Sequence, residues 1–331
     1  MNAASRSVSR ATAAAGSIAV GLVIVATAGA AETTGGFALK PVSQKSLGLW
    51  EGGKPVLVYN HGVISKEGVP ARYNRACYVH PLYGLDGEVL TDDFPVDHRH
   101  HRGVFWGWPH VRIGGKEYNS WVPGSMSYRL DRWVRKEADK RRARLEAING
   151  WYVGEKKVAD ERLRITVLPA GADGRAIDLD FTWTATDRPI ELKGAAGKSY
   201  GGLTVRFNTR FREKGGIQAK DVTITAPQGV TKKDLAIAPL PWADFTAPLA
   251  AGGQRSGLAL LVHPSHPDYP PTWLTRHYGC LCIGWPGVKA GTLQPGKAVR
   301  CRYRLWIHRG QVDLKALTAA YKAYQAAKDE D

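Results

Sequence analysis

Alternating hydrophobic and polar residues run through most of the chain after its first thirty-odd positions. A period of two, with many β-branched and aromatic residues, is typical of half-buried antiparallel strands. The clearest such runs are residues 127–136, 162–168, 176–186, 203–211 and 299–308. Another strand-like segment, residues 103–113, follows a loop that is rich in acids. The pattern therefore predicts an all-β fold.

Turn residues separate these runs. Asp-Gly or Gly-Gly pairs occur in LDGEV (85–89), IGGKEY (113–118) and GADGR (171–175), and such pairs accept the positive φ of tight hairpin turns. No repeat and no Pro/Ser-rich linker divides the chain, and a sandwich can hold well over 200 residues in one domain. We therefore expect one large antiparallel β-sandwich over residues 49–311, preceded by an N-terminal segment, residues 31–48.

A helix is predicted near the C-terminus, within residues 312–331. Leu314, Leu317, Tyr321 and Tyr324 recur at helical spacing behind an aspartate at position 313, a residue type that favours the N-cap. Their shared apolar face is expected to pack on the outside of a sheet.

The N-terminus has the features of a secretory signal. Arg6 and Arg10 precede an apolar, alanine-rich run that ends in small residues, and residues 1–30 contain no acid. This pattern predicts cleavage after Ala30 and a periplasmic or secreted mature protein. An uncleaved membrane anchor is the alternative, because the run from 11 to 28 is nearly long enough to span a bilayer.

The chain is strongly basic, with 46 Lys and Arg against 30 Asp and Glu and a formal net charge of +16. Residues 1–30 hold two Arg and no acid, so the charge without them falls from +16 to +14. Nucleic acid, an anionic membrane surface or an acidic polysaccharide would suit this balance. Export argues against nucleic acid, and no later segment approaches a transmembrane length. The densest basic cluster, residues 131–144, is expected to be a solvated hairpin tip or a docking surface for an acidic glycan.

Four cysteines, Cys77, Cys280, Cys282 and Cys301, can form disulfides in an oxidising compartment, where four allow three connectivities. Cys280 and Cys282 lie two apart in a strand-like segment, so they share a face and are not expected to pair with each other. A zinc site on this pair and a third cysteine is the alternative, although the spacing matches no recognised finger. The pairing stays open.

The candidate chemistry is concentrated in DHRHHR, residues 97–102, where three imidazoles and two guanidinium groups follow one carboxylate. His98 and His100 share a face if the block is extended, and both can polarise or protonate substrate oxygens. Arg102, on the same face, can hold a negative charge, and Asp97 can orient an imidazole or act as a base. These four residues are the predicted catalytic set.

Other strand-like runs also end in histidine. His61 and His80 close two runs in the first part of the chain, and His263 ends an apolar run further on. Prolines after it break strand pairing and project His266 and Arg276 from irregular backbone. We expect these five side chains to bind substrate in one pocket with the predicted catalytic set.

Tryptophans extend the predicted binding surface. The chain has 11 of them, and several lie beside Gly or Pro. Trp106, Trp108 and Trp273 are the candidates for substrate contact, because flat aromatic rings suit the apolar faces of sugars. Core packing is expected to account for most of the others.

Three stretches and one short motif carry a resemblance to a known family. The stretches are RYNRACYVHPLYGLDGEVLTDDFPVDHRHHRGVFWGWPHVRIGGKEYNSW (72–121), GGLTVRF (201–207) and HPSHPDYPPTWLTRHYG (263–279). The motif is the D-H-x-H-H-R-G block, in which Arg99 stands where the family more usually has a small residue or proline. Over roughly residues 50–310, the chain resembles a bacterial family of unknown function that carries the label methane oxygenase PmoA.

This resemblance implies a large β-sandwich of the galactose-mutarotase type, found in exported bacterial proteins linked to carbohydrate use. The label itself implies no function here, because the methane monooxygenase subunit of that name is a membrane-embedded helical protein. We therefore expect a small-molecule or oligosaccharide substrate, no nucleic-acid partner and no membrane contact beyond the signal segment.

The first of three functions left open is a carbohydrate-active enzyme that works on a glycoside by acid–base chemistry. Hydrolysis, elimination and epimerisation are all compatible with the sequence. Hydrolysis by two opposed carboxylates would draw on Asp93, Asp97, Glu117 and Asp268.

The second function is a metal-dependent oxygenase or hydrolase with iron, copper or zinc. Its ligands would be His98, His100 and one of His80, His263 or His266. The third is a non-catalytic glycan-binding module that relies on Trp106 or Trp273. The sequence assigns no cofactor.

Overall fold

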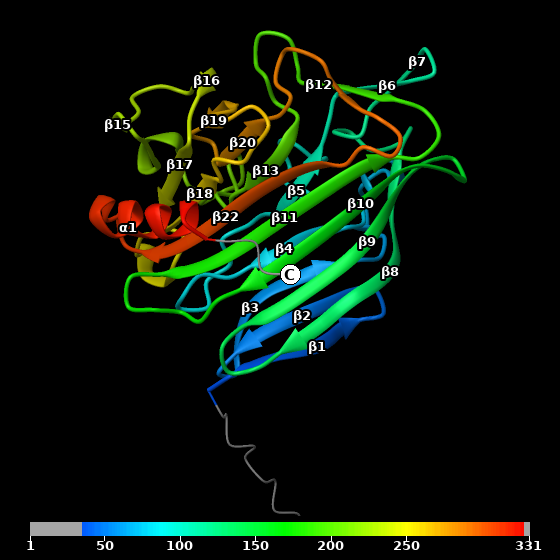
Figure 1. Ribbon diagram of the computed structural model, residues 1–331. Helices are drawn as coiled ribbons and strands as arrows, with labels where there is room; N and C mark the ends of the chain where they lie inside the picture. Colours follow the sequence, from blue (N-terminus) through cyan, green and yellow to red (C-terminus); the bar gives the residue numbers. More distant parts are fainter. Residues whose placement is uncertain (1–34, 328–331) are drawn as a thin grey trace, which may run out of the picture. The chain divides into compact units, whose positions relative to one another are not determined.

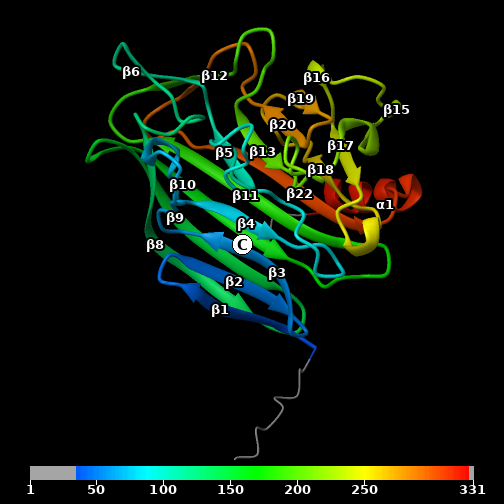
Figure 2. The same ribbon diagram turned by 180° about the vertical axis from the view of Figure 1, so that it is seen from behind.

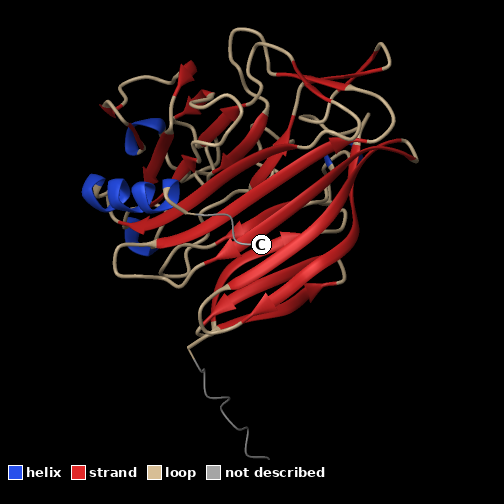
Figure 3. Ribbon diagram, in the orientation of Figure 1, coloured by secondary structure: helices blue, strands red, loops and turns tan. Residues whose placement is uncertain are grey.

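Two nine-stranded antiparallel sheets pack face to face and make up most of residues 35–327, the part of the chain that the computed structural model describes (Figures 1 and 3). Sheet I has the order β1 (Phe37–Ser43), β2 (Ser46–Glu51), β3 (Lys54–Asn60), β4 (Tyr78–Leu82), β5 (Val104–Gly107), β13 (Gly202–Arg206), β20 (Cys280–Gly284), β19 (Thr272–Arg276) and β16 (Ala236–Pro239). Sheet II has the order β15 (Gly229–Val230), β14 (Thr223–Ala226), β17 (Trp242–Ala247), β18 (Ser256–Val262), β22 (Val299–Arg309), β11 (Arg175–Ala185), β10 (Lys156–Val167), β9 (Ala143–Val153) and β8 (Ser127–Ala138). A smaller sheet III consists of β21 (Gly291–Leu293), β12 (Ile190–Lys193), β6 (His110–Ile113) and β7 (Lys116–Tyr118). The predicted all-β antiparallel sandwich is confirmed.

The sandwich begins earlier in the chain than predicted. β1 and β2 already pair within sheet I, so the sheet starts at Phe37 and includes most of the segment 31–48. At the edge of the sheet β1 exposes most of its side chains, and its sequence therefore lacks a clear apolar alternation. The predicted signal peptide, residues 1–30, lies outside the described residues.

Most of the alternating runs became strands of sheet II. Four of the five correspond to parts of β8, β10, β11 and β22. Residues 203–211 form a strand only as far as Arg206. The segment 103–113 divides at Pro109 between β5 of sheet I and β6 of sheet III, because proline has no N–H to donate to a ladder.

The predicted turns lie where strands meet. Gly114 and Gly115, with φ of 55° and 81°, connect β6 to β7, and residues 171–175 lead from β10 into β11. In the third turn the N–H of Gly84 donates to the carbonyl of Glu88 at 2.8 Å. The basic cluster 131–144 forms the β8–β9 hairpin, as predicted.

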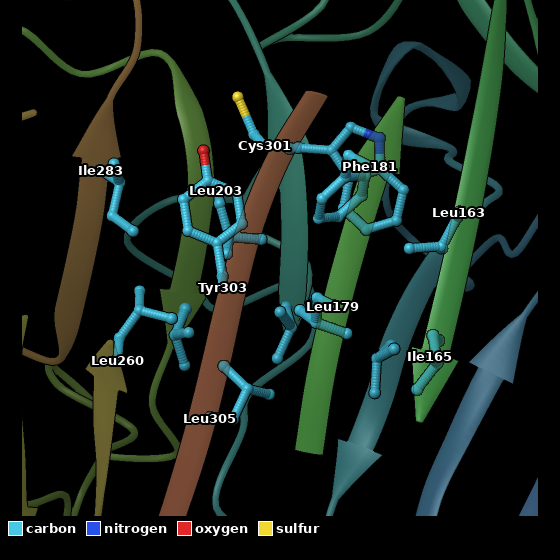
Figure 4. Close-up of a cluster of buried hydrophobic side chains, with 14 of the residues drawn as sticks. Leu163, Ile165, Leu179, Phe181, Leu203, Leu260, Ile283, Cys301, Tyr303 and Leu305 are labelled. Carbon is cyan, nitrogen blue, oxygen red and sulfur yellow. The ribbon is translucent and has the colours of Figure 1, made fainter. Parts of the chain in front are cut away.

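The core fills the space between sheets I and II. Phe207, just past β13, stacks on Phe245 of β17 with ring centroids 3.9 Å apart, which joins the inner faces of the two sheets. Figure 4 shows aliphatic and aromatic side chains from both sheets in one buried cluster. Its labelled members are Leu163, Ile165, Leu179, Phe181, Leu203, Leu260, Ile283, Cys301, Tyr303 and Leu305.

The predicted C-terminal helix is α1 (Leu314–Gln325), and it packs on the outer side of sheet II (Figure 1). The Asp313 carboxylate caps it by accepting from the N–H groups of Lys315 and Ala316. Its predicted apolar face is buried except for Leu314, which is 48% exposed in the first turn. Short 3₁₀ helices also occur in loops, namely η1 (Ala71–Tyr73), η2 (Ala219–Asp221) and η3 (Ala251–Gly253). No helix in residues 35–327 is long and apolar enough to span a bilayer.

All four cysteines are free and buried. Cys280 and Cys282 share the outer face of sheet I, as their spacing predicted, and pack with Leu274. Cys77 and Cys301 belong to the main core instead.

Candidate functional site

The outer face of sheet I, which points away from sheet II, carries the candidate site; Figure 2 shows the molecule from the side of this sheet. Alternate residues of a strand share a face, and Val79 and Val205 point into the core, so their neighbours point outward. The outward side chains include Tyr78, His80, Phe105, Arg206, Arg276 and Cys280. The block 97–102, in the connection from β4 to β5, lies against this face.

A buried carboxylate links His98 to sheet I. Asp97 Oδ2 lies 2.9 Å from Nδ1 of His98, and its Oδ1 accepts from Nη2 of Arg206 at 2.8 Å. The side chains of Asp97 and Arg206 are 2% and 0% exposed, whereas that of His98 is 35% exposed. The Asp97 contact occupies Nδ1, so Nε2 is the ring nitrogen of His98 left for a substrate.

Ring stacking holds the imidazole of His98 in place. It stacks on His101 at 4.7 Å and on Tyr278 at 5.1 Å between ring centroids, with interplanar angles of 13° and 12°. The ring of His100 meets it edge-on at 5.7 Å. We refer to Asp97, His98, His100, His101, Arg206 and Tyr278 as the His98 cluster.

The electrostatics of the cluster keep one carboxylate charged and two imidazoles neutral. Burial acts to raise the pKa of Asp97, but the His98 hydrogen bond and the Arg206 charge outweigh it and lower that pKa to about 2. Burial, followed by the nearby His98 and Arg75, lowers the pKa of His100 to about 4. Burial also lowers the pKa of His101 well below its usual value.

Arg102 has a structural position instead of the predicted anion-binding one. Its side chain is 0% exposed, and its Nε donates to Asp93 Oδ1 at 2.5 Å. Its remaining donors reach the carbonyl of Tyr73 and the hydroxyl of Tyr78, and its guanidinium covers the Phe94 ring at 3.4 Å. Arg102 is therefore buried under residues 97–101 with its donors engaged by other protein groups, and it offers no group to a ligand.

His80 is the one predicted substrate-binding histidine that lies beside the cluster. Its Nδ1 is 3.0 Å from the hydroxyl of Thr91. Burial lowers its pKa, with smaller and opposed effects from Asp93 and Arg102. These contacts place His80 next to the Arg102–Asp93 pair.

The three predicted substrate-binding tryptophans are buried in the core. Trp106 and Trp108 are 2% and 0% exposed, and Trp273 is 0% exposed. Their indole N–H groups donate to Glu161, the carbonyl of Trp285 and the carbonyl of Leu240, respectively. Trp106 and Trp273 occupy inner-face positions of β5 and β19, and Trp108 lies just past β5. The structure therefore places all three tryptophans in the core and not on the face that carries the His98 cluster.

The other predicted histidines lie elsewhere. His61 packs edge-on against Trp133 of β8, with ring centroids 5.6 Å apart. His263 contacts Arg302 and Tyr324 on the side of sheet II.

The second histidine of that loop, His266, lies 3.2 Å from the hydroxyl of Tyr303. Arg276 donates to the carbonyl of Leu235 and also affects the titration of Tyr278, so it borders the His98 cluster. Of the predicted binding residues, the structure thus brings only His80 and Arg276 to the outer face of sheet I, where the cluster lies.

A cavity of about 340 Å³ lies near the cluster, and its lining includes Arg72, Asn74, Arg75 and residues 123–129 but no member of the cluster. The ring centroid of Tyr73, which lies between Arg72 and Asn74 in the chain, is 6.5 Å from that of His100. Oδ1 of Asn74 is buried and accepts no hydrogen bond from the described residues.

Within residues 35–327, no group of three or more His, Cys, Asp or Glu side chains has the arrangement of a metal site. His98 and His100 are adjacent, but none of the predicted third ligands, His80, His263 and His266, completes such a group with them.

Three members of the cluster were absent from the predicted site, namely His101, Arg206 and Tyr278. Arg206 lies in GGLTVRF and Tyr278 in the stretch 263–279, both of which carry the family resemblance. Local sequence gave no sign that Arg206 on β13 and Tyr278 in the β19–β20 turn meet, because their contact depends on the pairing of β13 with β20.

The chain belongs to the family of unknown function DUF6807, whose model matches residues 47–322. The expected membership of a family of unknown function is therefore confirmed, while the match says nothing of the PmoA label. A search of curated proteins finds no match.

Several solved structures match this chain at low similarity. A galactose mutarotase related enzyme from Lactobacillus acidophilus is 8% identical, with 84% of this chain and 100% of that chain covered and a TM-score of 0.36. The heparan sulfate lyase HepC from Pedobacter heparinus is 8% identical, with 84% and 36% covered and a TM-score of 0.32. A polysaccharide lyase is 12% identical, with 86% and 34% covered and a TM-score of 0.32. This chain thus spans about a third of the length of each lyase.

Proposed function

We propose that this protein is an exported carbohydrate-active enzyme in which His98 transfers a proton to or from a sugar. Export is supported by the signal pattern of residues 1–30 and is tested by fractionation of cells that produce the full chain. The catalytic part of the proposal depends on the His98 cluster.

The observation that carries the proposal is the contact between Asp97 and His98. Because its pKa is lowered to about 2, Asp97 is a carboxylate at neutral pH and accepts a hydrogen bond from the Nδ1–H of His98. That contact fixes the tautomer and leaves the lone pair of Nε2 free to act as a general base. Arg206 holds the carboxylate, and the stacked Tyr278 and His101 rings fix the imidazole plane.

Neutral groups around His98 suit a polyhydroxylated substrate. His100 stays uncharged at neutral pH and can donate or accept a hydrogen bond to a hydroxyl. Asn74 and Arg72 bring an amide and a guanidinium group to the wall of the nearby cavity of about 340 Å³. A cavity of that size accommodates a sugar unit.

The geometry favours proton abstraction over hydrolysis by two carboxylates. Asp93 and Asp97 are engaged by Arg102 and Arg206, respectively. Glu117 lies on sheet III beside His110. The fourth candidate, Asp268, follows the His263–His266 turn, away from the cluster. An imidazole base with no opposing carboxylate is suited to elimination or epimerisation of a sugar.

The test is turnover on a panel of glycosides and oxidised glycosides, with and without a chelator. We expect turnover that His98→Gln and Asp97→Asn reduce by about 10³-fold or more, the second because an amide at position 97 no longer enforces the tautomer. His110→Gln is the matched control, since His110 forms a similar pair with Glu117 on sheet III at 2.6 Å. Saturable sugar binding with no turnover would instead support a non-catalytic module.

A second measurement does not depend on the substrate. Nitrogen-15 NMR of the imidazoles should show His98 protonated at Nδ1 and free at Nε2, and this pattern should be lost in Asp97→Asn. A wild-type His98 protonated at Nε2 contradicts the proposed mechanism.

A further inference from the structure

The outer face of sheet II, formed by β8–β11 and β22 in Figure 1, lies on the opposite side of the core from the His98 cluster. Arginine is the commonest residue at the centre of this face. Three consecutive cross-strand rows span β9, β10, β11 and β22. The rows are Arg144–Thr166–Asp178–Arg304, Glu146–Arg164–Asp180–Arg302 and Ile148–Arg162–Thr182–Arg300. These described positions hold six arginines and three carboxylates, and we refer to them as the arginine face.

Most of these arginines converge on one pocket. The pocket has a volume of about 210 Å³ and is lined by Arg144, Arg164, Arg300, Arg302 and Arg304, with Asp178 and Asp180 among them. Arg304 donates from Nε and Nη2 to the two oxygens of Asp178 at 2.6 and 2.8 Å. Arg300 Nε donates to Asp180 at 2.9 Å. The carboxylates thus orient guanidinium groups whose planar forks match carboxylate or sulfate oxygens.

A larger cavity lies beyond Arg300. It has a volume of about 940 Å³, and Arg300 lines both it and the smaller pocket. Lys289 and Asp268 lie in its wall, together with Trp285 and several prolines and glycines. The larger cavity has room for several sugar units, and the arginines border it at Arg300.

We propose that the arginine face and the cavity beyond Arg300 bind an acidic polysaccharide, with its carboxylate or sulfate groups on the arginines and its chain in the cavity. The inference depends on the number and convergence of the arginines, whichever groups they contact in the free protein. It goes beyond the proposed function and does not depend on His98.

The composition of the face favours a glycan over nucleic acid. None of the described side chains in the three rows is aromatic. The aromatic residues that line the pocket and the cavity, Tyr324 and Trp285, are 1% and 5% exposed, so neither presents an open ring on which bases could stack. The threonines of the rows, Thr166 and Thr182, can hydrogen-bond to sugar hydroxyls.

The test is binding of the full protein to polygalacturonate, with neutral dextran and duplex DNA as comparison ligands. We expect binding to polygalacturonate that weakens with salt, and no binding to dextran. Arg164→Gln should raise the Kd roughly fivefold, and Arg164→Gln with Arg300→Gln about 25-fold. Arg188→Gln removes the same charge from an exposed turn outside the face and should leave the Kd unchanged.

Several results overturn the inference: no binding to polygalacturonate at low salt, equal binding to dextran, tighter binding to DNA, or equal losses in the Arg164 and Arg188 variants. If the glutamine variants do not fold, the lysine variants Arg164→Lys and Arg300→Lys retain the charge. Wild-type affinity that does not change with salt then overturns the inference by itself. His98→Gln should bind polygalacturonate like the wild type, so this inference and the catalytic proposal can fail separately.

Discussion

Trp106 donates its indole N–H to Oε2 of Glu161 at 2.6 Å, and this bond joins sheet I to sheet II inside the core. Trp151 and Trp183 donate to the same oxygen at 2.9 and 3.0 Å, and Asn149 donates to Oε1 at 2.9 Å. Burial raises the pKa of Glu161, and these four donors act to lower it. A buried carboxyl group is thus held by neutral N–H groups from three other strands.

Replacement of this carboxyl group should destabilise the fold. Glu161→Gln sets an amide N–H₂ against the indole donors, so we expect a loss of about 2–4 kcal/mol in the free energy of unfolding. Urea denaturation measures the change. The exposed Glu155→Gln is the control and should leave the midpoint unchanged. A Glu161→Gln protein as stable as the wild type would show that the indole network does not stabilise the native state.

Arg102 should behave as a structural residue. Arg102→Gln leaves Asp93 and the Tyr78 hydroxyl without their buried partner, and breaking a buried pair costs about 3–5 kcal/mol. His98→Gln, at a partly exposed ring, should change stability far less. Thermal unfolding of the two variants compares them directly. Equal melting temperatures would restore Arg102 as a candidate for substrate binding.

The Asp97 carboxylate should make stability depend on acid pH. Its pKa falls from 3.8 to about 2 on folding, so its contribution is fully present above 3.8 and is lost as the pH falls through about 2. The shift corresponds to a contribution on the order of 2 kcal/mol. Urea unfolding at a series of acid pH values should show this loss in the wild type and a smaller one in Asp97→Asn. If the free energy of unfolding falls equally with pH in both proteins, Asp97 is not the source of the loss.

His308 should make the stability of the fold depend on pH with the opposite sign, so that stability is lost as the pH rises. Burial acts to lower its pKa, but the bond from Nε2 to Asp244 Oδ1, at 2.8 Å, outweighs burial and raises that pKa above 6.5. Its contribution is therefore full below pH 6.5 and is lost as the pH rises through the folded value. Unfolding free energies on both sides of neutrality should show this loss in the wild type and in His110→Gln. The loss should be absent from His308→Gln, and its persistence there would point to another group.

Strand positions could be predicted from the sequence because they depend on local alternation. β8, β10, β11 and β22 lie where a period of two placed them, and Asp313 caps the predicted helix. β1 was missed, because an exposed edge strand carries no apolar alternation.

The candidate site could be predicted only in part. The composition of residues 97–102 indicated a site, and Asp97, His98 and His100 do lie together in the His98 cluster. The same reasoning placed Arg102 and Trp106 at the substrate, although one is buried beneath the block and the other lies in the core.

By itself, the sequence determined the all-β class, the main strands and the concentration of ionisable groups, since each depends on residues close together in the chain. The tertiary structure alone decided which of those groups meet. Arg206 reaches Asp97 across more than a hundred positions because β13 pairs beside β5, and His263 stays with sheet II because β18 pairs with β22. Pairing between distant strands sets which face each side chain occupies, and no local pattern specifies it.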